Sequence, residues 1–346
     1  MPQRQPDNAG GPVGMVNSGM VNCGAATYAD PDHFQVSIRA ADVDLVVTAG
    51  GRFEGSLTRI DFKSLWLQKG IETLPRIARI GFARNRAVLF FSSDHRHGFF
   101  SDGAEVRPDH LVLYEPGQQT HQRSVDGLGW SALSLTSSTL AALAEDVGLI
   151  VRIPVGGKHV IPSPTELQRL RRLHALAAGR ARSDPDVLFH PSTCHALEQH
   201  LLSLFLRCTS LKEENPRGAA WRKRTRHLRQ LDELLREDPE KPFYMLEICQ
   251  KLGISERALQ LCCQDHLGMS PSRYLRLRRL HLARRALQYE TSAVVRVSDI
   301  AARFGFWEFG RFAVEYRRHF GESPSTTLRR PATEPAPMPL EFSEFA

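Results

Sequence analysis

The fold of the C-terminal third is decided by residues 245–267, which read MLEICQKLGISERALQLCCQDHL. Four apolar residues at its start follow the i, i+3, i+4, i+7 spacing of an amphipathic helix: Met245, Ile248, Cys249 and Leu252. Gly253 predicts the end of that helix, and Ser255 is a typical residue to cap the next one. The second helix turns three residues inward: Leu259, Cys262 and Cys263. A short helix, a turn with glycine and a capped second helix form a helix-turn-helix.

The same pattern recurs at residues 297–316, which read VSDIAARFGFWEFGRFAVEY. The inner face of the first helix is expected to consist of Ile300, Ala301 and Phe304. Gly305 predicts its end, and the second helix is expected to bury Phe309, Phe312 and Tyr316. One such unit is common in ordinary helical cores, whereas two in tandem favour a DNA-binding domain.

A single helix is predicted between the two units, over residues 271–287. Its 17 residues span roughly 25 Å at 1.5 Å per residue. Such a rod can hold two recognition helices about one DNA turn apart, roughly 34 Å, so that both enter major grooves on one face. One polypeptide then does what a dimer of simpler helix-turn-helix proteins does.

The positive charge of the chain is concentrated in this same part. The whole sequence has a formal net charge of +7. Residues 215–330 contain 23 Lys and Arg against 13 Asp and Glu, a net charge of +10, whereas the rest has 22 against 25, a net charge of −3. A basic segment joined to a mildly acidic remainder is typical of a nucleic-acid-binding domain attached to another module.

Five motifs resemble, in order and spacing, the DNA-binding domain of the AraC/XylS family. They are residues 252–255 (LGIS), 268–271 (GMSP), 279–287 (RLHLARRAL), 300–306 (IAARFGF) and 320–324 (FGESP). The resemblance covers about 90 residues. Residues 305–312 also look like the branch of the family whose N-terminal half is an AraC-like ligand-binding domain.

The resemblance implies which residues of the first recognition helix face DNA: Glu256, Arg257, Gln260 and Leu261. Arginine can bond guanine through two hydrogen bonds, glutamine can do so with adenine, and glutamate accepts a hydrogen bond from cytosine. Leu261 stands where the family often has arginine, and its side chain can only meet a thymine methyl group.

The second recognition helix offers fewer groups for hydrogen bonding. The matching positions are Phe309, Gly310, Arg311, Ala313 and Val314. We therefore expect the first unit to supply most of the sequence readout, and the second to anchor on phosphates through Arg311, Arg317 and Arg318. Thr327-Leu328 replaces the Tyr-Arg pair usual in the family, which puts the last helical contact in doubt.

Residues 34–135 predict a β-rich region. Seven short runs rich in Val, Ile, Leu and Phe alternate with turn signals such as Gly50-Gly51 and Pro116-Gly117: 34–39, 45–49, 53–62, 64–68, 87–92, 110–114 and 128–135. Such a pattern is typical of a β-sandwich or barrel, whose interior can hold a small ligand. Leucine-rich helices at about 164–178 and 194–211 either pack on this region or, as the resemblance suggests, form a dimer.

The chain is thus predicted to be a two-domain α+β protein, with an N-terminal β-barrel or sandwich-like sensor, flanking helices, and a C-terminal all-α domain with tandem helix-turn-helix units. The expected boundaries are a disordered tail at 1–33, a β-rich ligand-binding and dimerisation domain at 34–211, a linker at 212–220, the DNA-binding domain at 221–330 and a tail at 331–346.

A sensor pocket has several candidate lining residues, each also understandable as an ordinary core or surface residue: Arg59, Trp66, Arg76, Phe90, Arg123 and Trp130. A cupin-type metal-dependent enzyme is the alternative, because His95 and His97 form an H-x-H motif to which His110 or His121 could add a ligand. No glutamate stands at the usual spacing, so surface histidines are favoured, and no metal, cofactor or catalytic residue is predicted.

The expected partners are double-stranded DNA, a small-molecule effector, RNA polymerase if the protein is an activator, and a second copy of the chain. A constitutive DNA-binding protein whose β-rich domain only dimerises stays open as well. No apolar run reaches the roughly 18 residues that a membrane span needs, and the first 30 residues do not resemble a signal peptide, so the expected location is the cytoplasm.

Overall fold

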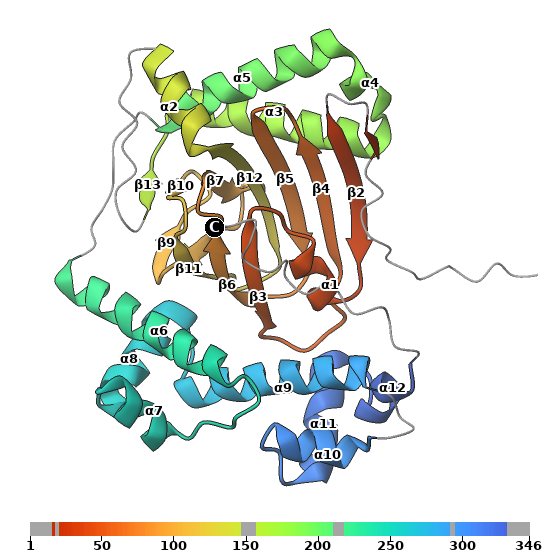
Figure 1. The fold of residues 1–346 in the computed structure, drawn as a ribbon, viewed down its shortest axis with the longest axis vertical. Coiled ribbons are helices and arrows are strands. Elements are labelled where there is room, and N and C mark those ends of the chain that lie inside the picture. The colour runs from red at the N-terminus through yellow and green to blue at the C-terminus, as the bar shows by residue number, and fades with distance from the viewer. Residues whose placement is uncertain (1–15, 18–20, 147–156, 210–217, 291–294, 331–346) are drawn as a thin grey trace, which may run out of the picture.

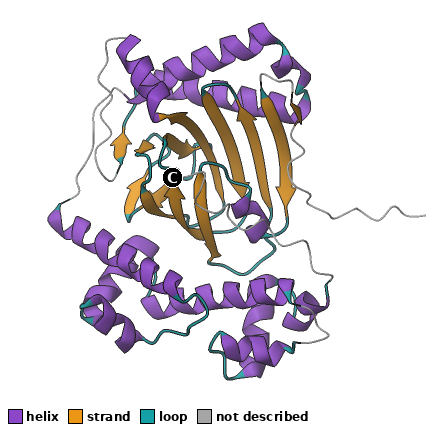
Figure 2. Ribbon diagram, viewed as in Figure 1, coloured by secondary structure: helices purple, strands orange, loops and turns teal. Residues whose placement is uncertain are grey.

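The computed structural model describes residues 16–17, 21–146, 157–209, 218–290 and 295–330. Figure 1 shows a β-rich region with a layer of helices on its outer side, and an all-helical region packed below it. Figure 2 separates the strands from the helices. The two-domain α+β prediction is confirmed, although the strands form two facing sheets and no closed barrel. No helix in the described part of the chain is both long enough and apolar enough to cross a membrane.

The larger sheet has eight strands in the order β1-β2-β4-β5-β12-β7-β10-β13. Their bounds are β1 Val16–Asn17, β2 Asn22–Tyr28, β4 Gly55–Asp61, β5 Leu65–Glu72, β12 Leu128–Thr136, β7 Arg86–Ser92, β10 Leu111–Tyr114 and β13 Lys158–Val160. The smaller sheet has the order β3-β6-β11-β8-β9. Its strands are β3 Ala41–Val47, β6 Arg76–Phe82, β11 Gln119–Arg123, β8 Phe99–Ser101 and β9 Ala104–Val106. All the pairings between these strands are antiparallel.

The larger sheet is covered on both faces, as strand β7 shows. Val88 and Phe90 belong to the apolar core between the two sheets. Leu89 and Phe91, which alternate with them, belong to a second core under the outer helices. A strand buried on both faces has an unbroken apolar sequence, which is why residues 87–92 stand out as a hydrophobic run.

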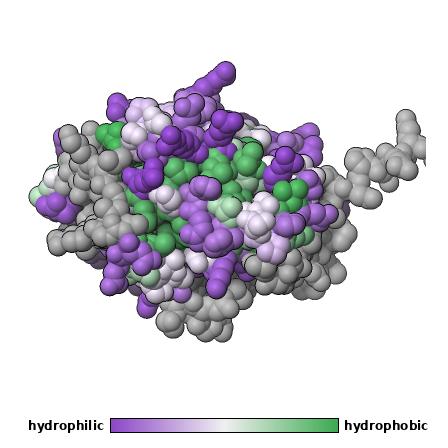
Figure 3. Space-filling model, turned by 90° about the horizontal axis from the view of Figure 1, so that it is seen from above, coloured by the Kyte–Doolittle hydropathy of each residue, from purple (hydrophilic) through white to green (hydrophobic). Residues whose placement is uncertain are grey.

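The outer helices are α2 Ser137–Asp146, α3 Pro164–Ser183, α4 Asp186–Phe189 and α5 Pro191–Thr209. Ser163 caps α3, because its side chain accepts a hydrogen bond from the Glu166 N–H at 3.2 Å. Leu170 and Leu201 are fully buried against the sheet, so the leucine-rich faces mainly pack on the β-rich region. Leu176 is 55% exposed, and Figure 3, viewed from this helical side, shows apolar surface framed by polar side chains.

Two predictions about the start of the chain are wrong. Residues 34–39 were expected to be a strand, but the chain forms helix α1 over Pro31–Val36. Asp30 caps this helix by accepting a hydrogen bond from the Asp32 N–H at 2.7 Å, and proline suits the first helical position. Residues 22–28 were expected to be disordered, but they form β2, which pairs with β4. Small residues make β2 hard to recognise, since Gly24, Ala25 and Ala26 give no hydrophobic alternation. The predicted tail at 331–346 lies outside the described residues.

The helical region consists of α6 Ala219–Glu237, α7 Met245–Leu252, α8 Glu256–Leu267, α9 Pro271–Tyr289, α10 Val297–Arg303, α11 Phe309–Phe320 and α12 Pro324–Arg329. The predicted rod is α9, and its 19 residues span about 28 Å. Each half of α9 belongs to a different core: Leu275 and Leu277 pack with α6, α7 and α8, whereas Leu280 and Leu287 pack with α10 and α11.

The helical region docks on the smaller sheet. Strand β3 turns Leu45 toward the other sheet and Val46 into the core shared with α6–α9. Strand β6 does the same with Ala78 and Ile77. The smaller sheet is therefore a single layer between the interior of the β-rich region and the helical region, as Figure 1 shows.

Candidate nucleic-acid interface

The first helix-turn-helix unit consists of α7 and α8, joined by a tight turn. Gly253 has φ +63°, a conformation that side-chain-bearing residues rarely adopt. The Ile254 N–H donates to the Cys249 carbonyl at 3.1 Å, which satisfies the end of α7. Ser255 then caps α8, its side chain accepting from the Ala258 N–H at 3.2 Å. These local bonds set the angle at which α8 leaves the turn.

Helix α8 has one buried and one exposed face. Leu259, Cys262 and Cys263 are fully buried under α6 and α9, as the apolar spacing predicts. Four residues on the opposite face are exposed: Glu256, Arg257, Gln260 and Leu261. Three of these side chains carry hydrogen-bonding groups, so this face has the chemistry needed to read base edges in a major groove.

The second unit consists of α10 and α11. Gly305 has φ +74°, and the Phe306 N–H donates to the Ala301 carbonyl at 2.9 Å. Glu308 stands at the cap position of α11, but its side chain makes no capping hydrogen bond. Three arginines of α11 are exposed: Arg311, Arg317 and Arg318. The second unit therefore repeats the turn of the first without its serine cap.

The exposed face of the second unit carries large apolar side chains beside Arg311. Phe309 is 45% exposed, so the prediction that it is buried is wrong; only Phe312 and Tyr316 reach the core. Trp307 and Val314 are 67% and 70% exposed. Hydrophobic spacing alone does not distinguish a phenylalanine that faces the core from one, like Phe309, that lies in the first turn of the helix and faces solvent. Arg311 pairs with Glu308 at 3.0 Å, and an exposed pair of this kind contributes little to stability.

Contacts along α9 fix the second unit to the rod. The Arg276 Nε donates to Glu315 Oε1 of α11 at 2.8 Å. A Cβ added to Gly305 would lie 2.7 Å from Arg279 Nη1 and 2.7 Å from the Pro242 side chain. The second unit therefore sits against α9 with no room for a larger residue at its turn. Thr327 and Leu328 of α12 are buried, so this pair contributes no exposed side chain to a DNA contact.

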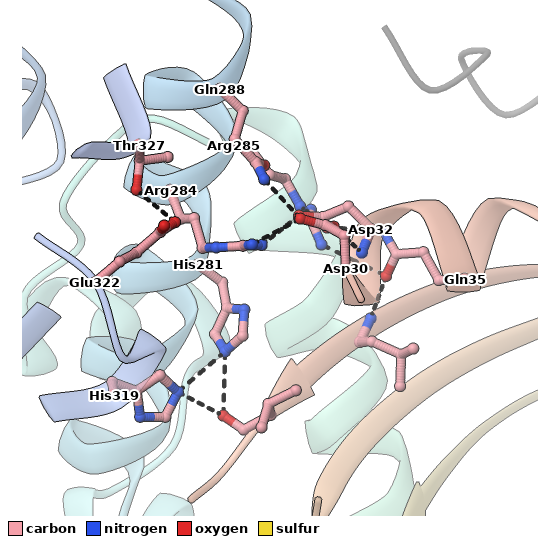
Figure 4. Close-up of polar contacts among 12 residues, drawn as sticks. Asp30, Asp32, Gln35, His281, Arg284, Arg285, Gln288, His319, Glu322 and Thr327 are labelled. Atoms are coloured by element: carbon pink, nitrogen blue, oxygen red, sulfur yellow. Dashed lines mark hydrogen bonds and ion pairs between the residues drawn. The ribbon is translucent and has the colours of Figure 1, made fainter. Parts of the chain in front are cut away.

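An acidic cluster on the β-rich region holds the second half of α9 (Figure 4). Arg284 pairs with Asp30 at 2.6 Å, and Gln288 donates to the same carboxylate at 2.6 Å. Arg285 pairs with Asp32 and, at 3.1 Å, with Asp44. Sequence analysis missed this junction because it joins segments that are some 250 residues apart.

The arginines hold two of these three carboxyl groups in the charged form, whereas burial raises the pKa of the third, Asp32. Burial would raise the pKa of Asp30, but the charge of Arg284 and three hydrogen bonds hold it at about 2. Burial is likewise outweighed at Asp44, where the charges of Arg285, Arg278 and Arg79 hold the pKa at about 2. Both groups are charged at neutral pH; Asp30 is matched by the buried Arg284, and Asp44 by the half-buried Arg285.

A pair of histidines forms the rest of this junction. The Nε2 atoms of His281 and His319 both lie 3.1 Å from the Val47 carbonyl oxygen of β3 (Figure 4). Burial lowers the pKa of His281, and the neighbouring His319 lowers it further. Burial lowers the pKa of His319 as well. Both rings are therefore neutral at pH 7, where each can donate one hydrogen bond to the carbonyl.

The first unit is held by different chemistry. His121 of β11 pairs with Asp232 of α6 at 2.8 Å, and both side chains are buried. Burial would lower the pKa of His121, but the charge of Asp232 raises it. The Trp221 side chain also donates to the Asp102 carbonyl at 2.7 Å. Sequence analysis considered His121 only as a metal ligand, and its acidic partner lies on the other domain.

The histidines considered for a metal site have other neighbours. His97 contacts Asp94 at 2.8 Å, and His95 lies 3.1 Å from an Arg171 nitrogen. His110 lies 2.9 Å from an Arg107 nitrogen. Among the residues that the structure describes, no group of three or more His, Cys, Asp and Glu side chains is placed to hold a metal ion.

A cavity lies between the two sheets. Of the six side chains predicted to line a pocket, Arg76, Phe90 and Trp130 do so. The other three lie elsewhere: Arg59 donates to the Ser37 carbonyl at 2.9 Å, Trp66 stacks with Arg86 at 3.7 Å, and Arg123 stacks on Phe100 at 3.8 Å.

The geometry defines a class of protein: two helix-turn-helix units on one rod, with their exposed faces equipped for DNA. A family model described as "Helix-turn-helix domain" matches residues 248–330. The "Probable thc operon regulatory protein" of Rhodococcus erythropolis is 40% identical over 90 residues, which are 26% of this chain and 27% of that protein. The "XylDLEGF operon transcriptional activator 3" of Pseudomonas putida is 40% identical over 95 residues, 27% of this chain and 29% of that protein.

The C-terminal domain of the chain is therefore an AraC-type DNA-binding domain. The match spans less than a third of each of these two relatives, and it lies in the helix-turn-helix region. Among solved structures, the AraC-like transcriptional activator CuxR is 14% identical, with a TM-score of 0.39 over 75% of this chain and 94% of that one.

Proposed function

We propose that the chain is a cytoplasmic, sequence-specific regulator of transcription in which α8 reads bases and α11 mainly anchors on phosphates. The observation that carries the proposal is the contrast between the two exposed faces. The face of α8 offers Glu256, Arg257 and Gln260 to base edges. The face of α11 offers apolar side chains, with Arg317 and Arg318 near its C-terminal end.

Two matched triple variants test this division. Genomic fragments selected by the full-length protein supply the specific site, and fluorescence anisotropy compares it with unrelated DNA. Replacing Glu256, Arg257 and Gln260 by alanine should lower the ratio of specific to non-specific affinity. Replacing Arg311, Arg317 and Arg318 by alanine should weaken both about equally and reduce the salt dependence of binding. An equal loss of specificity in the two variants contradicts the proposal.

We also propose that a small molecule bound between the two sheets modulates DNA binding. The support is the position of the smaller sheet. Val43, Leu45 and Ala78 line the cavity, while the residues that alternate with them on the same strands meet the helical region. A ligand that shifts β3 or β6 therefore acts on the docking surface through a single layer of backbone.

Filling the cavity from either sheet tests this coupling. Ala78→Leu adds volume on β6, whose other face docks the helical region. Ala132→Leu adds the same volume from β12 of the larger sheet. The first variant should change the Kd for DNA by several-fold and the second should change it less, with stability followed by urea unfolding. Equal effects contradict the proposed route.

The remaining partners follow from the family. The apolar surface on the outer helices, which includes Leu176 and the half-buried Leu173 and Leu204, suits a homodimer interface. Leu176→Glu should then convert a dimer to a monomer in sedimentation velocity. RNA polymerase is a partner if the protein is an activator. No specific observation favours the enzyme alternative.

A further inference from the structure

The cavity between the sheets ends in a buried polar cluster. Its walls are apolar, with Phe82 and Ile80 from one sheet and Phe90, Val88 and Trp130 from the other. The cavity is partly open to solvent, and an apolar lining with a few converging polar groups is typical of a small-molecule site. Three of the five polar residues in the lining form this cluster: Glu72, Arg76 and Gln122.

Nearly every hydrogen-bonding group of that cluster is already used. Glu72 accepts from Arg76 Nε at 3.2 Å through one oxygen and from Trp130 Nε1 at 2.8 Å through the other. Gln122 accepts from Arg76 Nη2 at 3.2 Å and donates to the Tyr114 hydroxyl at 3.0 Å. Each acceptor oxygen of Glu72 and Gln122 thus already accepts one hydrogen bond from within the cluster.

One guanidinium nitrogen of Arg76 is left without a hydrogen-bond partner within the described part of the chain. Arg76 is 2% exposed, and its Nη1 atom has no hydrogen-bond partner among the described residues. A buried guanidinium N–H without a partner is costly, so a molecule that supplies an acceptor oxygen there gains a strong hydrogen bond. Arg76 and Glu72 also balance each other's charge at 3.2 Å. A second carboxylate in this cluster would leave a buried negative charge without compensation.

Gln68, at another part of the lining, offers nothing further. Its side chain accepts from the Arg39 N–H at 2.9 Å and donates to the Arg39 carbonyl at 2.9 Å. Arg39 itself pairs with Asp61. The main polar feature that the cavity presents is thus one guanidinium nitrogen, Arg76 Nη1, that is unpartnered among the described residues, in a largely apolar space where the charges of Arg76 and Glu72 balance.

We propose that the cavity binds an uncharged, apolar molecule with a single acceptor oxygen, such as a ketone or an ester, which accepts a hydrogen bond from Arg76 Nη1. The proposal rests on the regulator function proposed above and names the class of its effector. Sugars and polyols do not fit, because a mostly apolar lining would leave most of their hydroxyl groups without partners. Amines do not fit, because their charge would lie beside that of Arg76.

Three probes of similar shape separate the classes: 4-phenyl-2-butanone, butylbenzene and 3-phenylpropanoate. Titration calorimetry with the full chain, without DNA, should give the tightest binding for the ketone. The affinity for the ketone should exceed the affinity for the hydrocarbon by roughly tenfold or more, as expected for one hydrogen bond to a charged donor. Tightest binding of the carboxylate, no preference for the ketone, or no binding of any probe overturns the proposal.

A charge-neutral double variant tests the donor. Arg76→Met with Glu72→Gln removes the guanidinium without leaving a buried charge, and should bring the ketone down to the affinity of the hydrocarbon. Arg79→Met with Asp42→Asn makes the same exchange in an ion pair of 2.8 Å that does not line the cavity. That control should keep the preference, and loss of it in both variants would count against Arg76.

The proposed regulator function and the proposed effector class are tested by different measurements. Selective DNA binding is measured without any probe, so a protein that binds its operator but not the ketone disproves only the effector class. A protein that binds the ketone through Arg76 but lacks operator specificity disproves the DNA-reading proposal and leaves the ligand site intact.

Discussion

The two helix-turn-helix units share a backbone plan but differ in what they expose. Both turn at a glycine with positive φ, at Gly253 and Gly305. The first has a serine cap and a polar reading face, whereas the second has an uncapped start and exposes Trp307 and Val314. Duplicated geometry therefore does not mean duplicated chemistry. The core positions fix the fold of each unit, and the outer positions vary independently of it.

The largest difference between the units should appear in how they are docked. Arg285→Met leaves the buried Asp32 with only the more distant Arg284, at 3.7 Å. The change also removes the ion-pair partner of the half-buried Asp44, and together these losses should cost about 3 kcal/mol. Arg236, on the first unit's side, lies 3.6 Å from Asp42 and is partly exposed, so Arg236→Met should cost about 1 kcal/mol or less. Urea unfolding measures both. Adding Asp44→Asn to Arg285→Met should recover part of the loss; comparable costs for the two arginines would contradict the comparison.

The next largest difference should be the cost in stability of replacing each turn glycine by alanine. A Cβ at Gly305 would lie 2.7 Å from two neighbouring groups, whereas a Cβ at Gly253 meets nothing within 4 Å. Both substitutions by alanine carry the cost of a positive φ, roughly 1–2 kcal/mol. Gly305→Ala should cost at least about 1 kcal/mol more than Gly253→Ala, because Arg279 or Pro242 must also move. Equal shifts in the free energy of unfolding would mean that the second turn relaxes freely.

Single arginines should separate reading from anchoring. Arg257→Ala should cost about 1–3 kcal/mol of binding at one base pair of the operator and relax specificity there. Arg317→Ala should weaken binding about uniformly across sequences and reduce the slope of log Kd against log salt by about 1. Anisotropy on a set of single-base-pair operator variants measures both. A base-specific effect of Arg317→Ala would overturn the division of roles.

These differences were only partly predictable from the sequence. The turn glycines, Ser255 and the apolar spacing are local signals, so both units could be predicted within a residue or two. Strand β6 carries Arg76 and Arg79 among its buried residues and gave no hydrophobic run. The acidic junction and the His121–Asp232 pair join distant segments, and no local pattern encodes which charges meet. Three of the six candidate pocket residues do not line the cavity, because the pattern of a strand does not tell which of its two faces points into the cavity.

Removing the cap residues of the two recognition helices should give a smaller difference in stability. Ser255→Ala removes the hydrogen bond to the Ala258 N–H and should cost about 1 kcal/mol. Glu308→Ala removes no capping bond and only an exposed ion pair with Arg311, so the expected cost is a few tenths of a kcal/mol. Thermal or urea unfolding of the two variants measures the difference. A larger loss for Glu308→Ala would show that the second recognition helix depends on its acidic start.

The last contrast is the pH dependence of the two docking sites. His281 and His319 have lowered pKa values in the folded protein, so the stability they contribute is present above about pH 6.5 and is lost as the pH falls below it. His121 has a raised pKa, so its contribution is complete below about pH 6.5 and is lost only as the pH rises through its folded value. Asp30 and Asp44, with pKa values of about 2, stay charged throughout this range.

Acidification from pH 7.5 to 5.5 should therefore loosen the second unit from β3 while the first unit keeps its hold on β11. The expected loss in the local opening free energy is on the order of 1 kcal/mol for each histidine that stays neutral in the folded protein, because each ring takes up a proton once the contact opens. Hydrogen exchange, corrected for intrinsic rates, measures it in the amides of Ala41–Val47 against those of Gln119–Arg123. His319→Gln keeps a neutral donor near Val47 and should remove much of the pH dependence at β3 only. Equal loosening of both strands would show that the two units are released together, and that the opposite histidine chemistry at the two docking sites has no separate effect.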